Sequence, residues 1–154
     1  MDYQIKYLSR ENKEWGFTLV ELIVVIGIAL LFFSISTSSF NSFKAHSNLE
    51  IAMGGTVEAI RLAQSSAQSG KGDSKWGVKI LTNKVIIFEG NTYNERDNYY
   101  DQFLTFSGGI NASGLSEIVF EKVSGTTINT GTIILTNNGE IKNIAINAKG
   151  TITY

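Results

Sequence analysis

The chain has 154 residues, with 13 basic and 14 acidic side chains, a single histidine, and no cysteine or proline. The absence of cysteine excludes a disulfide framework and a thiolate zinc site, and one histidine argues against a His-cluster metal centre and a Ser-His-Asp triad. The near-zero net charge gives no support to a strongly basic nucleic-acid binder or an acidic disordered chain.

The N-terminal third changes character abruptly. Residues 1–16 are polar, whereas Phe17–Phe43 contains one charged side chain, Glu21. The 22 uncharged residues Leu22–Phe43 would span about 33 Å as a helix, close to the hydrocarbon thickness of a bilayer. We therefore expect 17–43 to form a transmembrane or assembly segment.

The next segment, 44–69, has the pattern of an amphipathic helix. Apolar or small residues recur there at intervals of three or four. They are Leu49, Ala52, Met53, Thr56, Ile60, Ala63 and Ala67. Gly70 and Gly72 favour an end to the helix near Ser69. A continuous helix of about 50 residues would be about 75 Å long, too long for a globule of this size, so its first half requires another environment.

From Trp76 onward the period changes to two, which predicts strands. The expected strands are 76–80, 85–88, 103–106, 118–123, 132–136, 140–147 and 151–154, separated by turns rich in Gly and Asn. Short strands with such turns indicate antiparallel pairing. The predicted fold class is α+β, with a long N-terminal helix packed on antiparallel sheets within 70–154, and with a two-sheet sandwich as one arrangement.

Glu21 needs a physical explanation because it lies in an apolar helix. An acidic side chain at the centre of a membrane is unfavourable by about 2.5 to 3.5 kcal/mol. Two explanations are open: the carboxylate reaches the membrane interface, or it meets a cation on a neighbouring chain.

Residues 16–21, Gly-Phe-Thr-Leu-Val-Glu, and the apolar run that follows resemble the N-terminal motif of the type IV pilin and type II secretion pseudopilin superfamily. The resemblance implies that a prepilin peptidase removes the leader 1–16 by cleaving after Gly16, and that the new amino group of Phe17 is methylated. It further implies that Glu21 neutralises this amino group on an adjacent subunit. The sequence departs from the motif in two respects: Glu14-Trp15 stands where the family often has basic residues, and the helix lacks a proline.

The resemblance also implies a location and partners. The subunit would be a single-pass protein of the cytoplasmic membrane, with 70–154 outside the cytoplasm, and would then join a pilus or pseudopilus with other pilins or pseudopilins. It would be no enzyme and would need no cofactor or metal.

Residues 45–154 are similar to the GspH/FimT branch of minor pseudopilins, through apolar spacing and glycines. The matching features are Ala59–Gln64, Trp76–Ile80, Ile133–Leu135, Gly139, Ile141, Ile144–Asn147 and Gly150–Ile152. One alternative is a type IV pilus minor pilin for DNA uptake or adhesion. Another is an unrelated exported β-sandwich with a signal peptide cleaved before Thr37.

Other polar residues carry weaker signals. Arg61 and His46 are expected on solvated surfaces, and Asn111-Ala112-Ser113 receives no role. The oxygen-rich segment 91–101 lacks EF-hand spacing, so we expect a solvated polar loop and leave calcium binding open. Residues 44–154 contain ten basic and ten acidic side chains, with Lys142 and Lys149 near the end, which gives little support to DNA binding.

Overall fold

A computed structural model describes residues 16–154, without the side chains of 35–42. The predicted leader, apart from Gly16, lies outside the described residues. The chain divides into two compact units, Met1–Ser38 and Ser39–Tyr154.

A single long helix, α1, runs from Leu19 to Gln68 and confirms the predicted helix within a few residues at each end. In the first unit, every described side chain of α1 is exposed. In the second unit, the predicted apolar stripe is buried, except for Met53, which is half-buried. The helix ends where Gly70 adopts a left-handed conformation with φ of 66°, which a glycine accepts without strain.

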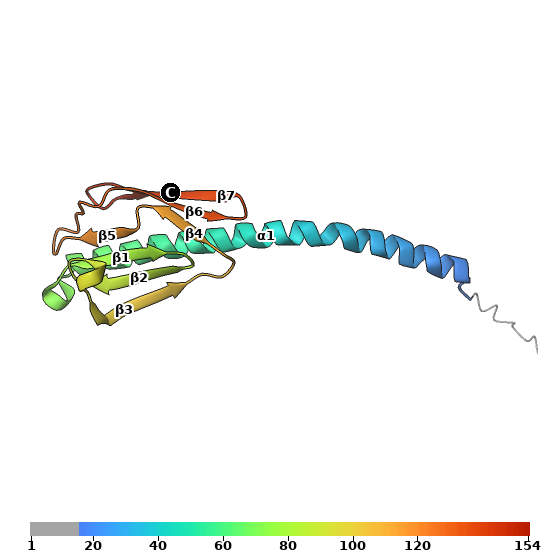
Figure 1. Cartoon of the computed structure of the whole chain (residues 1–154), viewed down its shortest axis with the longest axis horizontal. Helices are drawn as coiled ribbons and strands as arrows, with labels where there is room; N and C mark the ends of the chain where they lie inside the picture. Colours follow the sequence, from blue (N-terminus) through green and yellow to red (C-terminus); the bar gives the residue numbers. More distant parts are fainter. Residues whose placement is uncertain (1–15) are drawn as a thin grey trace, which may run out of the picture. The chain divides into compact units, whose positions relative to one another are not determined.

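Two antiparallel sheets of four strands follow (Figure 1). The first, in the order β3-β2-β1-β5, contains β1 (Trp76–Leu81), β2 (Lys84–Glu89), β3 (Asp97–Thr105) and β5 (Glu117–Phe120). The second, in the order β4-β6-β7-β8, contains β4 (Asn111–Gly114), β6 (Gly131–Asn137), β7 (Glu140–Ile146) and β8 (Ile152–Thr153). Short 3-10 turns, η1 (Lys71–Asp73) and η2 (Tyr93–Glu95), precede β1 and β3.

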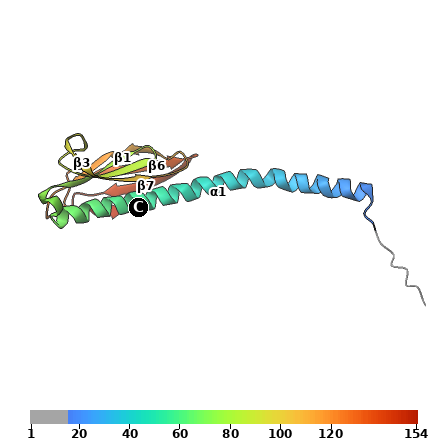
Figure 2. The same ribbon diagram turned by 90° about the horizontal axis from the view of Figure 1, so that it is seen from below.

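The core of the second unit lies between α1 and the two sheets, and Figure 2 shows the last turns of α1 running along one side of the strands. Alternate strand residues point into it, as period-two burial requires. They are Trp76, Val78 and Ile80 of β1, Val85 and Ile87 of β2, Ile118 and Phe120 of β5, Ile133 and Leu135 of β6, and Ile144 and Ile146 of β7. The α+β class with antiparallel sheets is therefore confirmed.

The strand boundaries differ from prediction in three places. Strand β3 begins at Asp97 rather than 103, because polar residues extend an exposed edge strand by backbone pairing. Strand β4, Asn-Ala-Ser-Gly, was missed because it pairs with β6 without an apolar pattern of its own. Strand β5 stops at Phe120, before a turn in which Gly125 N–H bonds Glu121 O.

Among the residues whose side chains are described, 16–34 and 43–154, no helical stretch has both the length and the apolar character needed to cross a membrane.

Candidate functional site

The candidate processing residues Gly16 and Phe17 lie just before α1, outside regular secondary structure. Phe17 is 80% exposed. A Cβ atom added to Gly16 would meet no other atom within 4 Å, so nothing in the described residues requires glycine at this position. Gly16 and Phe17 are therefore both accessible.

Thr18 caps the N-terminus of α1. Its Oγ1 accepts a hydrogen bond from the Glu21 backbone N–H at 3.2 Å, and its carbonyl accepts from the Leu22 N–H at 3.1 Å. Thr-x-x-Glu is the capping-box pattern, which satisfies free N–H groups in the first helical turn. Sequence analysis missed this function, although the spacing of Thr18 and Glu21 was a usable signal.

The predicted assembly residue Glu21 lies in the first turn of α1, where a negative charge interacts favourably with the helix dipole. Its side chain is exposed, and no cationic group within residues 16–154 lies within salt-bridge distance of it. The carboxylate is therefore open to a cation from outside the described part of the chain.

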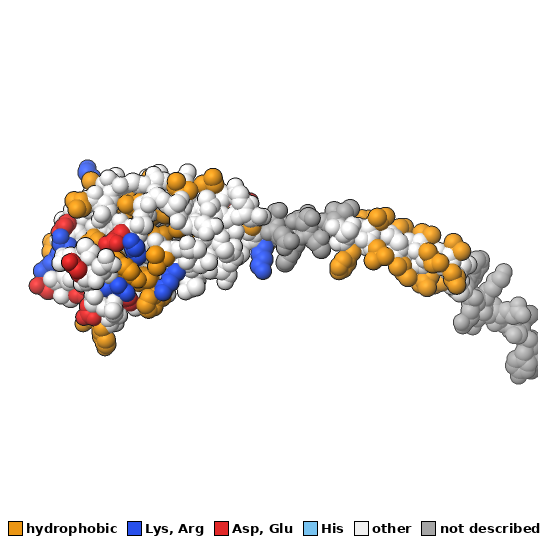
Figure 3. All heavy atoms as spheres, in the orientation of Figure 1, with side chains coloured by type: hydrophobic (Ala, Val, Ile, Leu, Met, Phe, Trp, Pro, Cys, Tyr) orange, Lys and Arg blue, Asp and Glu red, His pale blue; other side chains and the backbone are white. Residues whose placement is uncertain are grey.

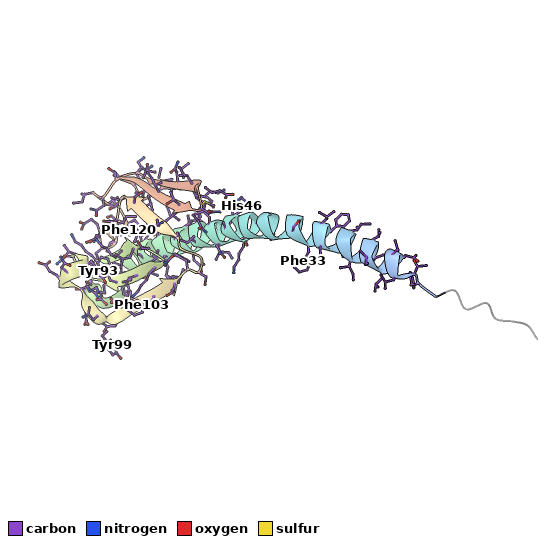
Figure 4. The ribbon with its side chains drawn as sticks, turned by 45° about the vertical axis from the view of Figure 1, so that its right-hand side comes forward. Phe33, His46, Tyr93, Tyr99, Phe103 and Phe120 are labelled. Atoms are coloured by element: carbon purple, nitrogen blue, oxygen red, sulfur yellow. The ribbon has the colours of Figure 1, made fainter. Side chains whose placement is uncertain are left out.

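Exposed apolar side chains are concentrated in the first turns of α1, and Figure 3 shows one face of them. Each large hydrophobic residue in this part is at least half exposed, up to 80% for Phe17 and 76% for Phe33, which is labelled in Figure 4. The set comprises Phe17, Leu19, Val20, Leu22, Ile23, Val24, Val25, Ile26, Ile28, Leu30, Leu31, Phe32 and Phe33. A helix that is apolar all round is normally buried in lipid or protein.

The segment 91–101 is held together by Arg96. Its Nε donates to both carboxylate oxygens of Asp101, at 3.0 and 2.9 Å, and its Nη1 donates to Tyr93 O at 2.7 Å. The guanidinium also lies 3.8 Å from the centre of the Tyr93 ring. The prediction of a solvated polar segment holds for Asn91, Asn94, Glu95, Asp97 and Asn98, which are exposed. It does not hold for Asp101, which is paired with Arg96, and residues 97–101 belong to strand β3 rather than to a loop.

The described part of the chain contains no preformed metal site. Residues 16–154, less the side chains of 35–42, contain no group of three or more Asp, Glu or His side chains arranged to hold a metal ion. Within 91–101, the carboxylate of Asp101 already accepts hydrogen bonds from Arg96.

Two side-chain contacts connect α1 to β7. His46 Nδ1 lies 2.8 Å from Glu140 Oε2, and Lys142 Nζ bonds Glu50 Oε1. The bond from Lys142 lowers the pKa of the Glu50 carboxyl, and the nearby His46 acts in the same direction. His46 is exposed as predicted, and Lys142 is engaged within the domain.

A groove of about 420 Å³ is lined by Lys44, Ala45, Asn48, Gly108, Asn137 and Asn138. Lys44 is the one titratable side chain among these lining residues, beside the amides of Asn48, Asn137 and Asn138.

Comparisons of the chain with models of protein families, with characterised proteins and with solved structures gave no significant match.

Proposed function

We propose that the chain is the precursor of a filament subunit of the type IV pilin and type II secretion pseudopilin superfamily. In this proposal, a prepilin peptidase cuts after Gly16, and the new Phe17 amino group is methylated. The observation that carries the proposal is an accessible Gly-Phe-Thr-Leu-Val-Glu string leading directly into a helix whose apolar side chains are exposed.

The exposed apolar side chains in the first turns of α1 support a function in which something other than this chain buries them. Full burial of a large aliphatic or aromatic side chain is favourable by roughly 1.5 to 3 kcal/mol. At least thirteen such residues lie between Phe17 and Phe33. Lipid before assembly and neighbouring helices after assembly would each provide the necessary cover.

Glu21 supports the filament step. Burial of the Glu21 carboxylate among apolar helices would be strongly unfavourable without a cation beside it. Cleavage after Gly16 creates an amino group at Phe17, and the same group on an adjacent subunit would neutralise Glu21. Each charge then removes the desolvation cost of the other.

The membrane step depends on Leu22–Phe43 as an uncharged sequence, of which the side chains of 35–42 lie outside the described residues. Before assembly the subunit would be held in the cytoplasmic membrane, with the second unit outside the cytoplasm. Its partners would be the peptidase and other pilins or pseudopilins.

The branch assignment remains the GspH/FimT-like minor pseudopilin, in a secretion system or pilus machine, based on the likeness of residues 45–154. The DNA-uptake alternative gains no support from the lysines near the C-terminal end. Lys142 is paired with Glu50, so Lys149 alone of these two is without a carboxylate partner to compete with a phosphate. A minor subunit would act structurally, through helix packing.

The test is the mature N-terminus, read by intact mass and N-terminal sequencing of the protein from a membrane that contains a prepilin peptidase. We expect a chain that begins at methylated Phe17. Gly16→Leu should block cleavage, whereas Gly27→Leu is the matched control, because a Cβ atom at Gly27 also meets nothing within 4 Å. A start at Thr37 or an intact Met1 would overturn the proposal.

A further inference from the structure

The groove of about 420 Å³ is built by three segments that lie far apart in the sequence. Lys44, Ala45 and Asn48 come from α1, Gly108 from the loop between β3 and β4, and Asn137 and Asn138 from the hairpin of β6 and β7. Apart from the alanine and the glycine, every lining side chain carries N–H donors, which belong to one ammonium group and three carboxamides. A groove with several donors and one positive charge suits an anion.

Packing holds two of the carboxamides in place. The Asn137 side chain is 7% exposed, and its Nδ2 donates to Ala45 O at 3.2 Å. A Cβ atom added to Gly108 would collide with Asn48 Nδ2, so the close approach of this amide requires glycine. Asn138, by contrast, is exposed and has a φ of 47°, as the Asn-Gly turn of a hairpin requires. The fold therefore shapes the groove and leaves the Asn138 amide available to a ligand.

Lys44 is the positive charge of the groove. It is exposed and forms no ion pair with any described residue. The sequence has no acidic residue within four residues of it on either side. The two carboxylates closest in sequence to the lining residues are Glu50 and Glu140. Neither lines the groove, and they accept hydrogen bonds from Lys142 and from His46, which is labelled in Figure 4.

The groove also lies beside the end of the apolar run. Lys44 directly follows Phe43, which is 70% exposed and is the last residue of the uncharged run. From Phe43 to Asn48, α1 rises by about 7.5 Å, and the headgroup layer on each side of a bilayer is about 5 to 7 Å thick. With the run in lipid, as the proposed function requires, the groove lies at the depth of the headgroup phosphates.

We propose that the groove binds the phosphate of an anionic phospholipid, an inference that rests on the proposed membrane-held precursor. The Lys44 ammonium matches the single negative charge of such a lipid, and the lining amides donate to its phosphate oxygens. The contact holds the second unit against the membrane before assembly. It is broken when the subunit leaves the lipid for the filament.

The test is native mass spectrometry of the chain purified from its native membrane, in a non-ionic detergent with equal amounts of phosphatidylglycerol and phosphatidylcholine. We expect the chain to retain phosphatidylglycerol in preference to phosphatidylcholine. Lys44→Gln should lower this preference about five-fold, the effect of one lysine at an anionic lipid surface. The matched control is Lys149→Gln, at an exposed lysine that lacks an ion pair among the described residues and lies outside the groove, and it should leave the preference unchanged.

A second pair of variants separates the groove from a lysine that acts alone. Asn138→Asp places a carboxylate in the groove, with a residue type that also accepts a left-handed turn, and should lower the preference about as much as Lys44→Gln. Asn143→Asp adds the same charge at an exposed position of β7 outside the groove and should have no effect. A preference that survives Lys44→Gln, or that Asn138→Asp leaves unchanged, would overturn the proposal.

Inorganic phosphate distinguishes the lipid from a free anion. Added at millimolar concentration, it should leave the retained phosphatidylglycerol in place, because the acyl chains also bind the detergent micelle and the apolar run. Displacement of the lipid by inorganic phosphate would assign the groove to a free anion and overturn the lipid.

The same spectra give the mass of the chain and hence its mature N-terminus, which separates the two proposals. A chain cut at Phe17 that shows no preference for phosphatidylglycerol overturns the lipid site alone. A preference that depends on Lys44 and Asn138 in a chain with a different N-terminus supports the lipid site and overturns the processing proposal.

Discussion

Two residues at the start of α1 have functions that can be separated by substitution. Thr18 and Glu21 form a capping-box pattern, in which Gln can replace Glu, whereas pairing with an amino group requires the charge. Sequence analysis recognised the charge of Glu21 and overlooked the cap. The fold therefore gives Thr18 a local function as helix cap, next to the function proposed for Glu21 in assembly.

We expect Glu21→Gln to keep the helix start and to lower incorporation into filaments at least tenfold. Thr18→Ala should do the reverse, weakening the first turn by about 1 kcal/mol while assembly continues. Incorporation is measured as the fraction of the chain recovered in sheared filaments, and helix content by circular dichroism. If Glu21→Gln assembles as well as the wild type, the charge of Glu21 has no role in assembly.

Substitution by alanine should change the free energy of unfolding in opposite directions at two glycines of the second unit. A Cβ atom at Gly77 in β1 would lie 2.5 Å from Phe88 Cζ and 2.8 Å from Ile118 O, whereas one at Gly54 in α1 would meet nothing within 4 Å. We expect Gly77→Ala to lower the free energy of unfolding by about 1 to 3 kcal/mol and Gly54→Ala to raise it by about 0.5 to 1 kcal/mol. Urea unfolding of the two variants measures both, and a neutral Gly77→Ala would show that Phe88 moves aside.

At the scale of elements, η2 and β3 depend on one guanidinium. The Asp101 side chain is 3% exposed and paired with Arg96, so removal of the cation leaves a buried charge without a partner. We expect Arg96→Met to lower the free energy of unfolding by about 3 kcal/mol, and Arg96→Met/Asp101→Asn to recover part of the loss. Urea midpoints measure the change, and an unchanged midpoint in the single variant would mean that water replaces Arg96.

The link between α1 and β7 should be sensitive to acid. Because Lys142 lowers the pKa of Glu50 in the folded chain, the pair stabilises the fold above the ordinary pKa of a glutamate, and this contribution is lost as the pH falls through the lowered value. The difference in urea midpoint between the wild type and Lys142→Met should therefore be fully present at pH 7 and become smaller as the pH falls below the ordinary pKa of a glutamate. A difference that does not change with pH would assign the effect to packing of the lysine stem.

The elements that the sequence predicted well are those with an apolar period. The buried stripe of α1 and the hairpin of β1 and β2 follow from spacing alone, because burial selects the pattern. Strand β4 and the start of β3 could not be predicted in this way, since their polar residues are held by backbone pairing, with β6 for β4 and with β2 for β3. The packing of Arg96 against Tyr93 and Asp101 was hidden for the same reason: it depends on where the chain folds back.

For the whole molecule, the two units differ in what stabilises them. The second unit has a core of its own, built from α1 after Leu49 and both sheets, whereas the described part of the first unit buries none of its side chains. The second unit should therefore fold without the first, and the first should need lipid or neighbouring chains.

A fragment spanning 44–154 tests this division. It retains every core residue and the ion pairs of His46 and Glu50, so we expect a monomer in solution that unfolds cooperatively in urea. The full-length chain should remain monodisperse only with detergent or lipid, and should aggregate when these are removed, because its apolar turns are then exposed to water. Size-exclusion chromatography and urea unfolding measure both properties. A fragment with native-like secondary structure and a broad transition would show that the first part of α1 also contributes to the core.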